Sequence, residues 1–317
     1  MTSVLAEDGV PHLEGPSFAR ERSDSAAGRR RHLPLYEARD DHKSNFDALR
    51  EKEEALVAEV SALDLAALRR GSLLSANGKT SVSLDLPTGQ TCVPTAICSA
   101  NCYTARPDAP VGWEKSLLKR LRNLRYFQLE AVDAAVARLT RDFARARRRW
   151  ASRARLDFLR VNGTGDLFPE IIPVLNGFAV QNPDVKLWIV TRKFDLAAGI
   201  ASRPNVFLQL SLDASTPPAL EGRALDLMQA HPRTYLSFLR TAAADDTRGA
   251  AIVFNEKRTA GLPYDRRTDC PVDAEEGALD LGNVRGVGGT ACSKCRKCFK
   301  ENVIVRQRSL LGLGGTP

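Results

Sequence analysis

Three cysteines that follow one another closely carry the strongest chemical signal in this sequence. Cys92, Cys98 and Cys102 are spaced C-x5-C-x3-C on a short segment that has no histidine beside it. Three thiols in such a segment favour an iron–sulfur cluster. A four-iron cluster held by three protein thiolates keeps one iron open for a ligand that is not protein. We therefore expect a [4Fe–4S] cluster on the loop 92–102.

The four remaining cysteines form a second group near the C-terminus. Cys292, Cys295 and Cys298 make a C-x2-C-x2-C run, and Cys270 precedes it. Four thiolates at these spacings suit either a structural zinc ion or a second [4Fe–4S] cluster, and the sequence leaves both open. Either metal would hold together a glycine-rich segment that has few apolar residues of its own.

Composition restricts the class of protein. Of the 317 residues, 43% are apolar and 26% are charged, as in an ordinary globular protein. No apolar run approaches the roughly 20 residues that span a bilayer, and the polar N-terminal stretch is unlike a signal peptide. We expect a cytoplasmic protein without membrane contact, whose thiols stay reduced. With His12, His32 and His42 all in the N-terminal stretch, a histidine-based triad or zinc site is nearly excluded.

The net charge of +8 and the pI of about 9.3 favour a polyanionic partner such as nucleic acid. Arginines are concentrated in a long helix that we expect to begin near Trp113, with an apolar seam from Leu129 to Trp150. Eight of them lie between Arg138 and Arg155. They are either a solvated helix face, on which arginine stems cover apolar surface, or a face that contacts phosphates.

The cysteine loop must be positioned by the elements around it, and these alternate between strand and helix. Short runs typical of strands lie at 81–86, 156–161, 185–191, 206–212, 235–239 and 251–254. Helical segments separate several of them, at 171–180, 194–201 and 219–230. This alternation predicts parallel strands with right-handed crossovers. We expect an α/β fold that is a six-unit parallel partial (β/α) barrel.

Three regions are predicted along the chain. Residues 1–45 have no sustained apolar period, so we expect a disordered basic arm. Residues 46–260 would form the partial (β/α)6 barrel, and residues 261–317 a cysteine-rich, metal-binding extension.

Polar residues follow each predicted strand at its carboxyl end, where parallel sheets place their chemistry. The segments are the cysteine loop, Asn162-Gly163-Thr164-Gly165-Asp166, Thr191-Arg192-Lys193, Ser211-Leu212-Asp213, Arg240-Thr241 and Asn255-Glu256-Lys257. Each segment is a weak signal alone. Their agreement in position predicts a site along one edge of the sheet.

These residues resemble a known family, the phage gene-product-88-like proteins, which are similar to the radical S-adenosylmethionine superfamily. The matching stretches are Asn77-Gly78-Lys79-Thr80, Cys92 to Tyr103, Arg160 to Asp166, Val190-Thr191-Arg192, Ser211-Leu212-Asp213 and the four C-terminal cysteines. The resemblance implies an architecture more than a particular reaction. The usual superfamily loop is C-x3-C-x2-C, so the loop of this chain is longer.

The resemblance also implies a cofactor, S-adenosylmethionine, on the open iron of the cluster. In the superfamily a Gly-Gly-Glu-like turn after the second strand holds the methionine amino group, and Gly165-Asp166 take that place here. The other residues expected to orient cofactor and substrate are Arg192, Lys193, Ser211, Asp213 and Glu256. Judged from the residues alone, Asp166 is also suited to cap a helix that begins near Pro169.

Two functions follow as hypotheses. The first is a radical enzyme that generates a 5′-deoxyadenosyl radical to modify an unknown substrate, with nucleic acid one option, and that receives electrons from a flavodoxin or ferredoxin. The second is a non-catalytic, metal-stapled protein that binds nucleic acid through the 138–155 helix and the basic arm.

Overall fold

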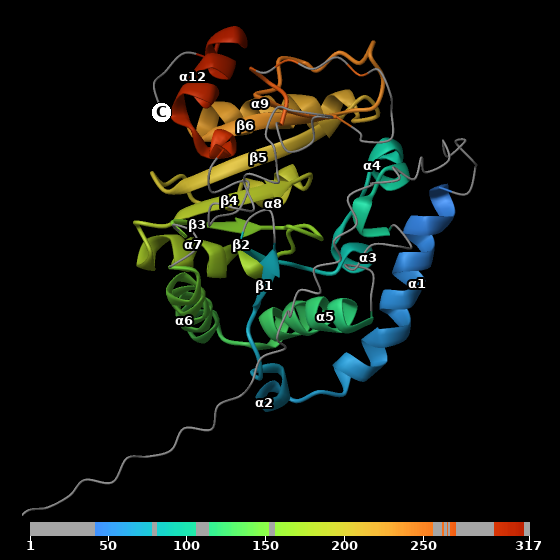
Figure 1. Ribbon diagram of the computed structural model, residues 1–317, viewed down its shortest axis with the longest axis vertical. Helices are drawn as coiled ribbons and strands as arrows, with labels where there is room; N and C mark the ends of the chain where they lie inside the picture. The colour runs from blue at the N-terminus through green and yellow to red at the C-terminus, as the bar shows by residue number, and fades with distance from the viewer. Residues whose placement is uncertain are drawn as a thin grey trace, which may run out of the picture. The chain divides into compact units, whose positions relative to one another are not determined.

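A single seven-stranded sheet forms the centre of the computed structural model, which describes residues 42–77, 81–105, 114–151, 156–255, 262, 265, 267–270 and 295–313. Its strands are β1 (Leu74–Asn77), β2 (Ser81–Leu84), β3 (Phe158–Val161), β4 (Lys186–Thr191), β5 (Val206–Asp213), β6 (Thr234–Arg240) and β7 (Ile252–Asn255). They lie side by side in the order of the sequence (Figure 1). Such an order places each crossover between neighbouring strands.

The sheet is mostly parallel. Strands β2 to β7 pair in parallel, with Leu84 opposite Val161 and Thr191 opposite Leu210. Strand β1 pairs antiparallel with β2 and was missed in the sequence, because four residues with little apolar character give no period to detect. The predicted α/β class and all six predicted strands are confirmed. The partial barrel stays a prediction.

The helices fall mainly between the strands. They are α1 (His42–Ser61), α2 (Leu65–Leu68), α3 (Thr88–Thr91), α4 (Ala96–Ala100), α5 (Glu114–Leu129), α6 (Val132–Trp150), α7 (Ile171–Gln181), α8 (Phe194–Ala197), α9 (Pro218–Ala230) and α12 (Glu301–Leu310), with short 3-10 turns η1 (Tyr103–Ala105) and η3 (Lys297–Phe299). Among the residues that the structure describes, no helix has the length and apolar character needed to cross a membrane.

The prediction of one long helix from near Trp113 to Trp150 is wrong, because the chain turns between α5 and α6. The Glu130 carboxylate holds this turn: it accepts a hydrogen bond from Ala131 N (3.2 Å) and pairs with Arg69 of the α2 region (2.7 Å). Leu129 and Val132 flank the turn and are 44% and 39% exposed, so they do not belong to the apolar seam.

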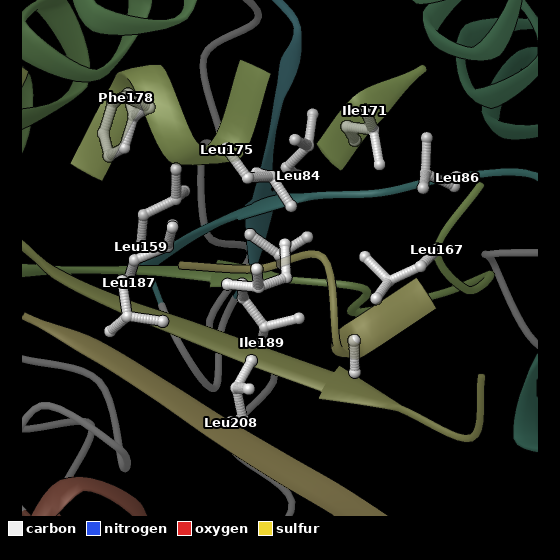
Figure 2. Packing of buried hydrophobic residues seen from close by; sticks show 14 of the residues in the cluster. Leu84, Leu86, Leu159, Leu167, Ile171, Leu175, Phe178, Leu187, Ile189 and Leu208 are labelled. Carbon is white, nitrogen blue, oxygen red and sulfur yellow. The ribbon is translucent and has the colours of Figure 1, made fainter. Parts of the chain in front are cut away.

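One face of the sheet packs against helices. Leu159, Leu187, Ile189 and Leu208 alternate along the strands toward this face, as the two-residue period of a strand requires. Figure 2 shows Ile171, Leu175 and Phe178 of α7 above these leucines. Helices α6 and α9 contribute Val136, Leu139, Phe143, Ala224 and Met228 to the same cluster.

The opposite face of the sheet packs against the C-terminal segment. Aromatic side chains from four successive strands, Phe158, Trp188, Phe207 and Tyr235, share a cluster with Phe299 of η3 and Ile304 of α12. The Phe299 ring lies 4.9 Å from the Phe158 ring, centroid to centroid. Residues 295–313 of the predicted extension therefore pack directly on the sheet. Its metal binding stays a prediction.

Helix α1 begins at His42, inside the stretch 1–45 that we predicted to be an arm. Residues 1–41 lie outside the described residues.

Candidate functional site

The cysteine loop leaves the carboxyl end of β2 and turns at once into α3, which ends at Cys92. The first backbone amides of this short helix have no partner within it. Glu53, a buried residue of α1, supplies the acceptors: Thr88 N donates to its Oε1 (3.0 Å) and Gly89 N to its Oε2 (2.7 Å). Helix α1 thus fixes the start of the loop, and Figure 1 shows it beside α3 and α4.

This approach of α1 requires glycine at position 89. A Cβ atom at Gly89 would lie 2.7 Å from the Arg50 Cα atom, closer than any side chain can come. Burial raises the pKa of Glu53, whereas the charge of Arg120 and the amides of Thr88 and Gly89 lower it. The carboxylate is therefore held by hydrogen bonds against the cost of removing it from water.

Cys98 lies on α4, and α4 is attached to the end of β5. Thr95 precedes the helix and accepts from Cys98 N (3.1 Å), as a helix-capping residue does. Its hydroxyl donates in turn to Asp213 Oδ2 (2.5 Å). Ser215 makes a parallel connection, since it accepts from Ile97 N (3.1 Å) and donates to Asp213 Oδ1 (2.7 Å). A buried carboxylate therefore sets the position of the second cysteine.

Cys102 is held by a chain of hydroxyls. Its sulfur lies 3.0 Å from Thr104 Oγ1, and Thr104 donates to Thr88 Oγ1 (3.1 Å) at the start of the loop. Cys92 and Cys102 both contact an apolar cluster formed by Phe46, Leu49, Ala105 and Leu117. The loop thus closes on itself, and α1 covers two of its thiols.

The three thiols share one electrostatic environment. Burial raises the pKa of Cys92 well above its usual value, and the nearby Cys98 and Cys102 raise it further. Burial also raises the pKa of Cys98, and Cys102 adds to that rise. Each thiol therefore lies within electrostatic reach of the other two.

The residues predicted after β3, β4 and β5 face the same thiols. Asp166 raises and Lys193 lowers the pKa of Cys92, after the larger effect of burial. Arg192 opposes the burial-induced rise for Cys98, whereas Asp213 adds to it. The structure thus brings four of the sequence-predicted residues to the cysteine loop, at the carboxyl ends of three strands.

Asp166 is buried and links two strand ends. Its Oδ1 accepts from Thr191 Oγ1 (2.5 Å) and Leu167 N (2.7 Å), and its Oδ2 accepts from Arg192 N (3.0 Å). Burial raises its pKa against these three bonds. Helix α7 begins only at Ile171 and is preceded by Glu170, so the alternative assignment of Asp166 as a cap of that helix is wrong.

Arg192 and Asp213 form a largely buried ion pair. Arg192 Nη1 lies 2.8 Å from Asp213 Oδ2, with the side chains 14% and 0% exposed. Ser211 lies two residues before Asp213 on β5, and so on the same face of the strand. At the β3 end, Gly165 has a φ of +72°, and a Cβ there would lie 2.5 Å from Leu86 O. Only glycine fits this turn.

The C-terminal cysteines also come together. Cys270 N donates to Val253 O of β7 (2.7 Å), which ties this residue to the last strand. Burial lowers the pKa of Lys297, and Cys295, Cys270 and Cys298 all act on it from nearby. Three of the four predicted ligands therefore lie within electrostatic reach of one lysine. Cys292 and the predicted site residue Glu256 lie outside the described residues.

The described members of the two cysteine groups are not arranged around a single metal ion. Among the residues that the structure describes, no group of three or more cysteine, histidine, aspartate or glutamate side chains is placed to hold one.

The arginines of α6 were predicted to form either a solvated face or a phosphate-contacting face. Two of them, Arg138 and Arg147, instead make contacts within the protein. Arg138 is buried, donates to Leu68 O (3.2 Å) and Gly71 O (3.0 Å), and lies over the Tyr126 ring. Arg147 pairs with Asp184 (2.7 Å). Arg141, Arg145, Arg148 and Arg149 are exposed, and residues 152–155 lie outside the described part of the chain.

The fold and the site together define a mixed α/β protein with a cysteine loop at the carboxyl edge of a mostly parallel sheet. A family model described as Gene product 88 matches residues 38–301, and the chain belongs to that family. The matched region includes both cysteine groups. Comparison with curated proteins and with solved structures gives no match.

Proposed function

We propose that this protein is an iron–sulfur enzyme of the radical S-adenosylmethionine type that modifies an unknown substrate. The observation that carries the proposal is the attachment of the cysteine loop to the strand ends: Thr95 and Arg192 both bind Asp213, and Arg192 N donates to Asp166. Sequential parallel strands that end at this site support the six-unit partial barrel, in which such a loop follows an early strand.

The residues of the loop fit a [4Fe–4S] cluster. Cys92, Cys98 and Cys102, which are all partly buried, would hold it. The chemistry supplied by a bound cluster is the reductive cleavage of S-adenosylmethionine, which yields a 5′-deoxyadenosyl radical. Arg192 and Lys193 bring positive charge to a site that is otherwise rich in thiols and carboxylates.

Asp166 is suited to bind an ammonium group of the cofactor. A carboxylate has about four acceptor positions, and three of those of Asp166 are used by Thr191, Leu167 and Arg192. The remaining position can accept a charge-assisted hydrogen bond. Gly165, whose turn admits no side chain, lets the backbone approach a ligand closely.

Asp213 has a different role. Thr95, Arg192 and two bonds from Ser215 occupy its two oxygens. It would therefore act as a positioning residue, which fixes the Cys98 helix and aims Arg192 at the site. Ser211 and Lys193 are left to contact cofactor or substrate, and Glu256 completes the predicted set.

The second cysteine group would serve stability or electron transfer. Cys270, Cys295 and Cys298, together with Cys292, would hold zinc or a second [4Fe–4S] cluster on the face of the sheet that packs against η3 and α12. A flavodoxin or ferredoxin would supply electrons to the enzyme.

Metal content in matched cysteine variants tests the proposal. Protein prepared without oxygen should contain iron and sulfide, and Cys98→Ser should lose about four of each. Cys295→Ser, the matched variant of the other group, should keep the iron of the loop and lose soluble yield, because loss of a structural metal costs folding free energy. A colourless protein that holds only zinc, or a Cys98→Ser variant with unchanged iron, would contradict the proposal.

A second candidate function is a non-catalytic, metal-stapled nucleic-acid-binding protein. The exposed arginines of α6, Arg141, Arg145, Arg148 and Arg149, favour it. Metal analysis of the protein prepared without oxygen separates the two candidates. A nucleic-acid-binding protein of this kind requires no iron at the loop and no cleavage of S-adenosylmethionine.

A further inference from the structure

A basic pocket lies on the side of the molecule formed by α2, α5 and α6, and its lining includes no cysteine among the described residues. Its volume is about 600 Å³, within the range of small-ligand sites. Five basic side chains, Arg70, Lys115, Lys119, Arg122 and Arg138, line it, and Glu114 is the only acidic side chain among its described lining residues.

Three of these cations are held by neutral partners. Lys119 Nζ donates to Leu74 O (2.5 Å), Arg122 Nη2 to Ala67 O (2.7 Å), and Arg138 to the carbonyl oxygens of Leu68 and Gly71. A carbonyl oxygen orients a cation without cancelling its charge. Backbone carbonyl oxygens therefore fix the positions of three of the positive groups in the pocket.

The pocket combines rigid and accessible groups. Arg138 is 5% exposed and clamped over the Tyr126 ring, so its guanidinium is part of the protein interior. Arg70 and Lys115 are exposed at the rim and can close on a ligand. Burial lowers the pKa of Lys119, and Asp85 and Asp142 oppose that shift. These two carboxylates favour the charged form of Lys119.

A row of arginines continues from the pocket along α6. Arg141, Arg145 and Arg149 are exposed and follow Arg138 at intervals of three and four residues, so all four share one face of the helix. From Arg138 to Arg149 the helix rises about 16 Å. An anion in the pocket could therefore extend along the helix as a chain of negative charges.

We propose that this pocket binds a phosphate group, either of a free nucleotide or of a nucleic-acid strand that continues along the arginine row of α6. Phosphate is the anion that best matches guanidinium forks together with point-charged lysines. The site is separate from the cysteine loop and does not depend on the function proposed for it. The sequence predicted anion binding by the 138–155 helix alone. This proposal places the centre of anion binding in the pocket, with the helix as its continuation.

Competition binding with full-length protein tests this assignment. The probe is a short, fluorescently labelled single-stranded oligonucleotide with a terminal phosphate, followed by polarisation at low salt. A nucleoside monophosphate and its parent nucleoside serve as competitors. We expect the monophosphate to compete and the nucleoside to fail, because only the former carries the group that the pocket binds.

Charge-matched variants locate the site. Arg70→Gln with Lys115→Gln changes only exposed side chains of the pocket, and Lys52→Gln with Arg203→Gln removes the same charge at exposed positions elsewhere. We expect the first pair to weaken binding about tenfold and the control pair by less than about twofold. Equal losses in the two pairs, competition by the nucleoside, or no binding by the wild type would overturn the proposal.

A third pair of substitutions identifies the source of the phosphate. Arg141→Gln with Arg149→Gln changes the arginine row and leaves the pocket intact. If the ligand is a nucleic-acid strand, this pair weakens oligonucleotide binding and reduces its salt dependence. If the ligand is a free nucleotide, the pair leaves monophosphate affinity unchanged and the pocket pair alone reduces it. Both results support the pocket and assign its ligand.

Discussion

Asp213 Oδ2 lies 2.5 Å from Thr95 Oγ1, although the two residues are 118 positions apart in the chain. The same oxygen is paired with Arg192. One buried carboxylate therefore connects the end of β5, the end of β4 and the helix that carries Cys98. The geometry of the cysteine loop depends on the sheet through this residue.

Asp213→Asn should destabilise the protein and release the loop. The substitution keeps the shape of the side chain but leaves the Arg192 guanidinium, 14% exposed, without its counter-charge. We expect the free energy of unfolding to fall by about 2–4 kcal/mol and iron at the loop to decrease. Urea denaturation and metal analysis measure the two effects.

The matched control is Asp195→Asn. Asp195 also pairs with an arginine, Arg223, but both side chains are largely exposed. Exposed ion pairs contribute little, so this variant should change the free energy of unfolding by less than about 1 kcal/mol. If the Asp213 and Asp195 variants were equally stable, the connecting role of Asp213 would be refuted.

Gly165→Ala should disturb the turn that places Asp166. Position 165 has a φ of +72°, and the new Cβ would lie 2.5 Å from Leu86 O. Backbone strain and the clash should together lower the free energy of unfolding by about 2–4 kcal/mol. Chemical denaturation is the measurement.

Gly222→Ala is the control for this substitution, because a Cβ at Gly222 of α9 would meet no atom within 4 Å. Alanine favours a helix interior, so this variant should be as stable as the wild type or more stable by up to about 1 kcal/mol. A tolerated Gly165→Ala would show that the turn can adopt another conformation.

Glu53 should make stability depend on pH. Its pKa in the folded protein is raised above 4.5, chiefly by burial, so the folded state binds its proton more tightly than the unfolded chain does. The stabilisation from Glu53 is therefore fully present below about pH 4.5 and is lost as the pH rises through the raised value. Unfolding midpoints measured across this range should fall more steeply for the wild type than for Glu53→Gln.

Glu51→Gln provides the comparison, since Glu51 is an exposed residue of the same helix. It should keep the pH profile of the wild type. Parallel profiles for the wild type and Glu53→Gln would mean that the cap of α3 does not depend on the charge of Glu53.

The sheet could be predicted from the sequence because strand periodicity is a local signal. Residues 185–191 and 206–212 alternate apolar side chains between two packed faces, and both strands were found within one residue of their limits. Strand β1 gave no such signal. The break between α5 and α6 depends on the pairing of Glu130 with Arg69, a contact between distant residues that no local pattern reports.

The candidate site was predicted where strand ends and cysteines coincide. Gly165, Asp166, Arg192 and Asp213 could be found because parallel strands bring their carboxyl ends to one edge. Thr95 was missed, although a threonine three residues before Cys98 is a capping signal. Glu53 carries no signal of its own, since a buried carboxylate on a helix looks like any surface glutamate in the sequence.

Cleavage of S-adenosylmethionine tests the central claim most directly. Protein reconstituted with iron and sulfide without oxygen, and supplied with a chemical reductant, should convert S-adenosylmethionine to 5′-deoxyadenosine, measured by chromatography. Cys98→Ser should form none under the same conditions. An iron-loaded wild type that forms no 5′-deoxyadenosine, or a Cys98→Ser variant that forms as much as the wild type, would contradict the account.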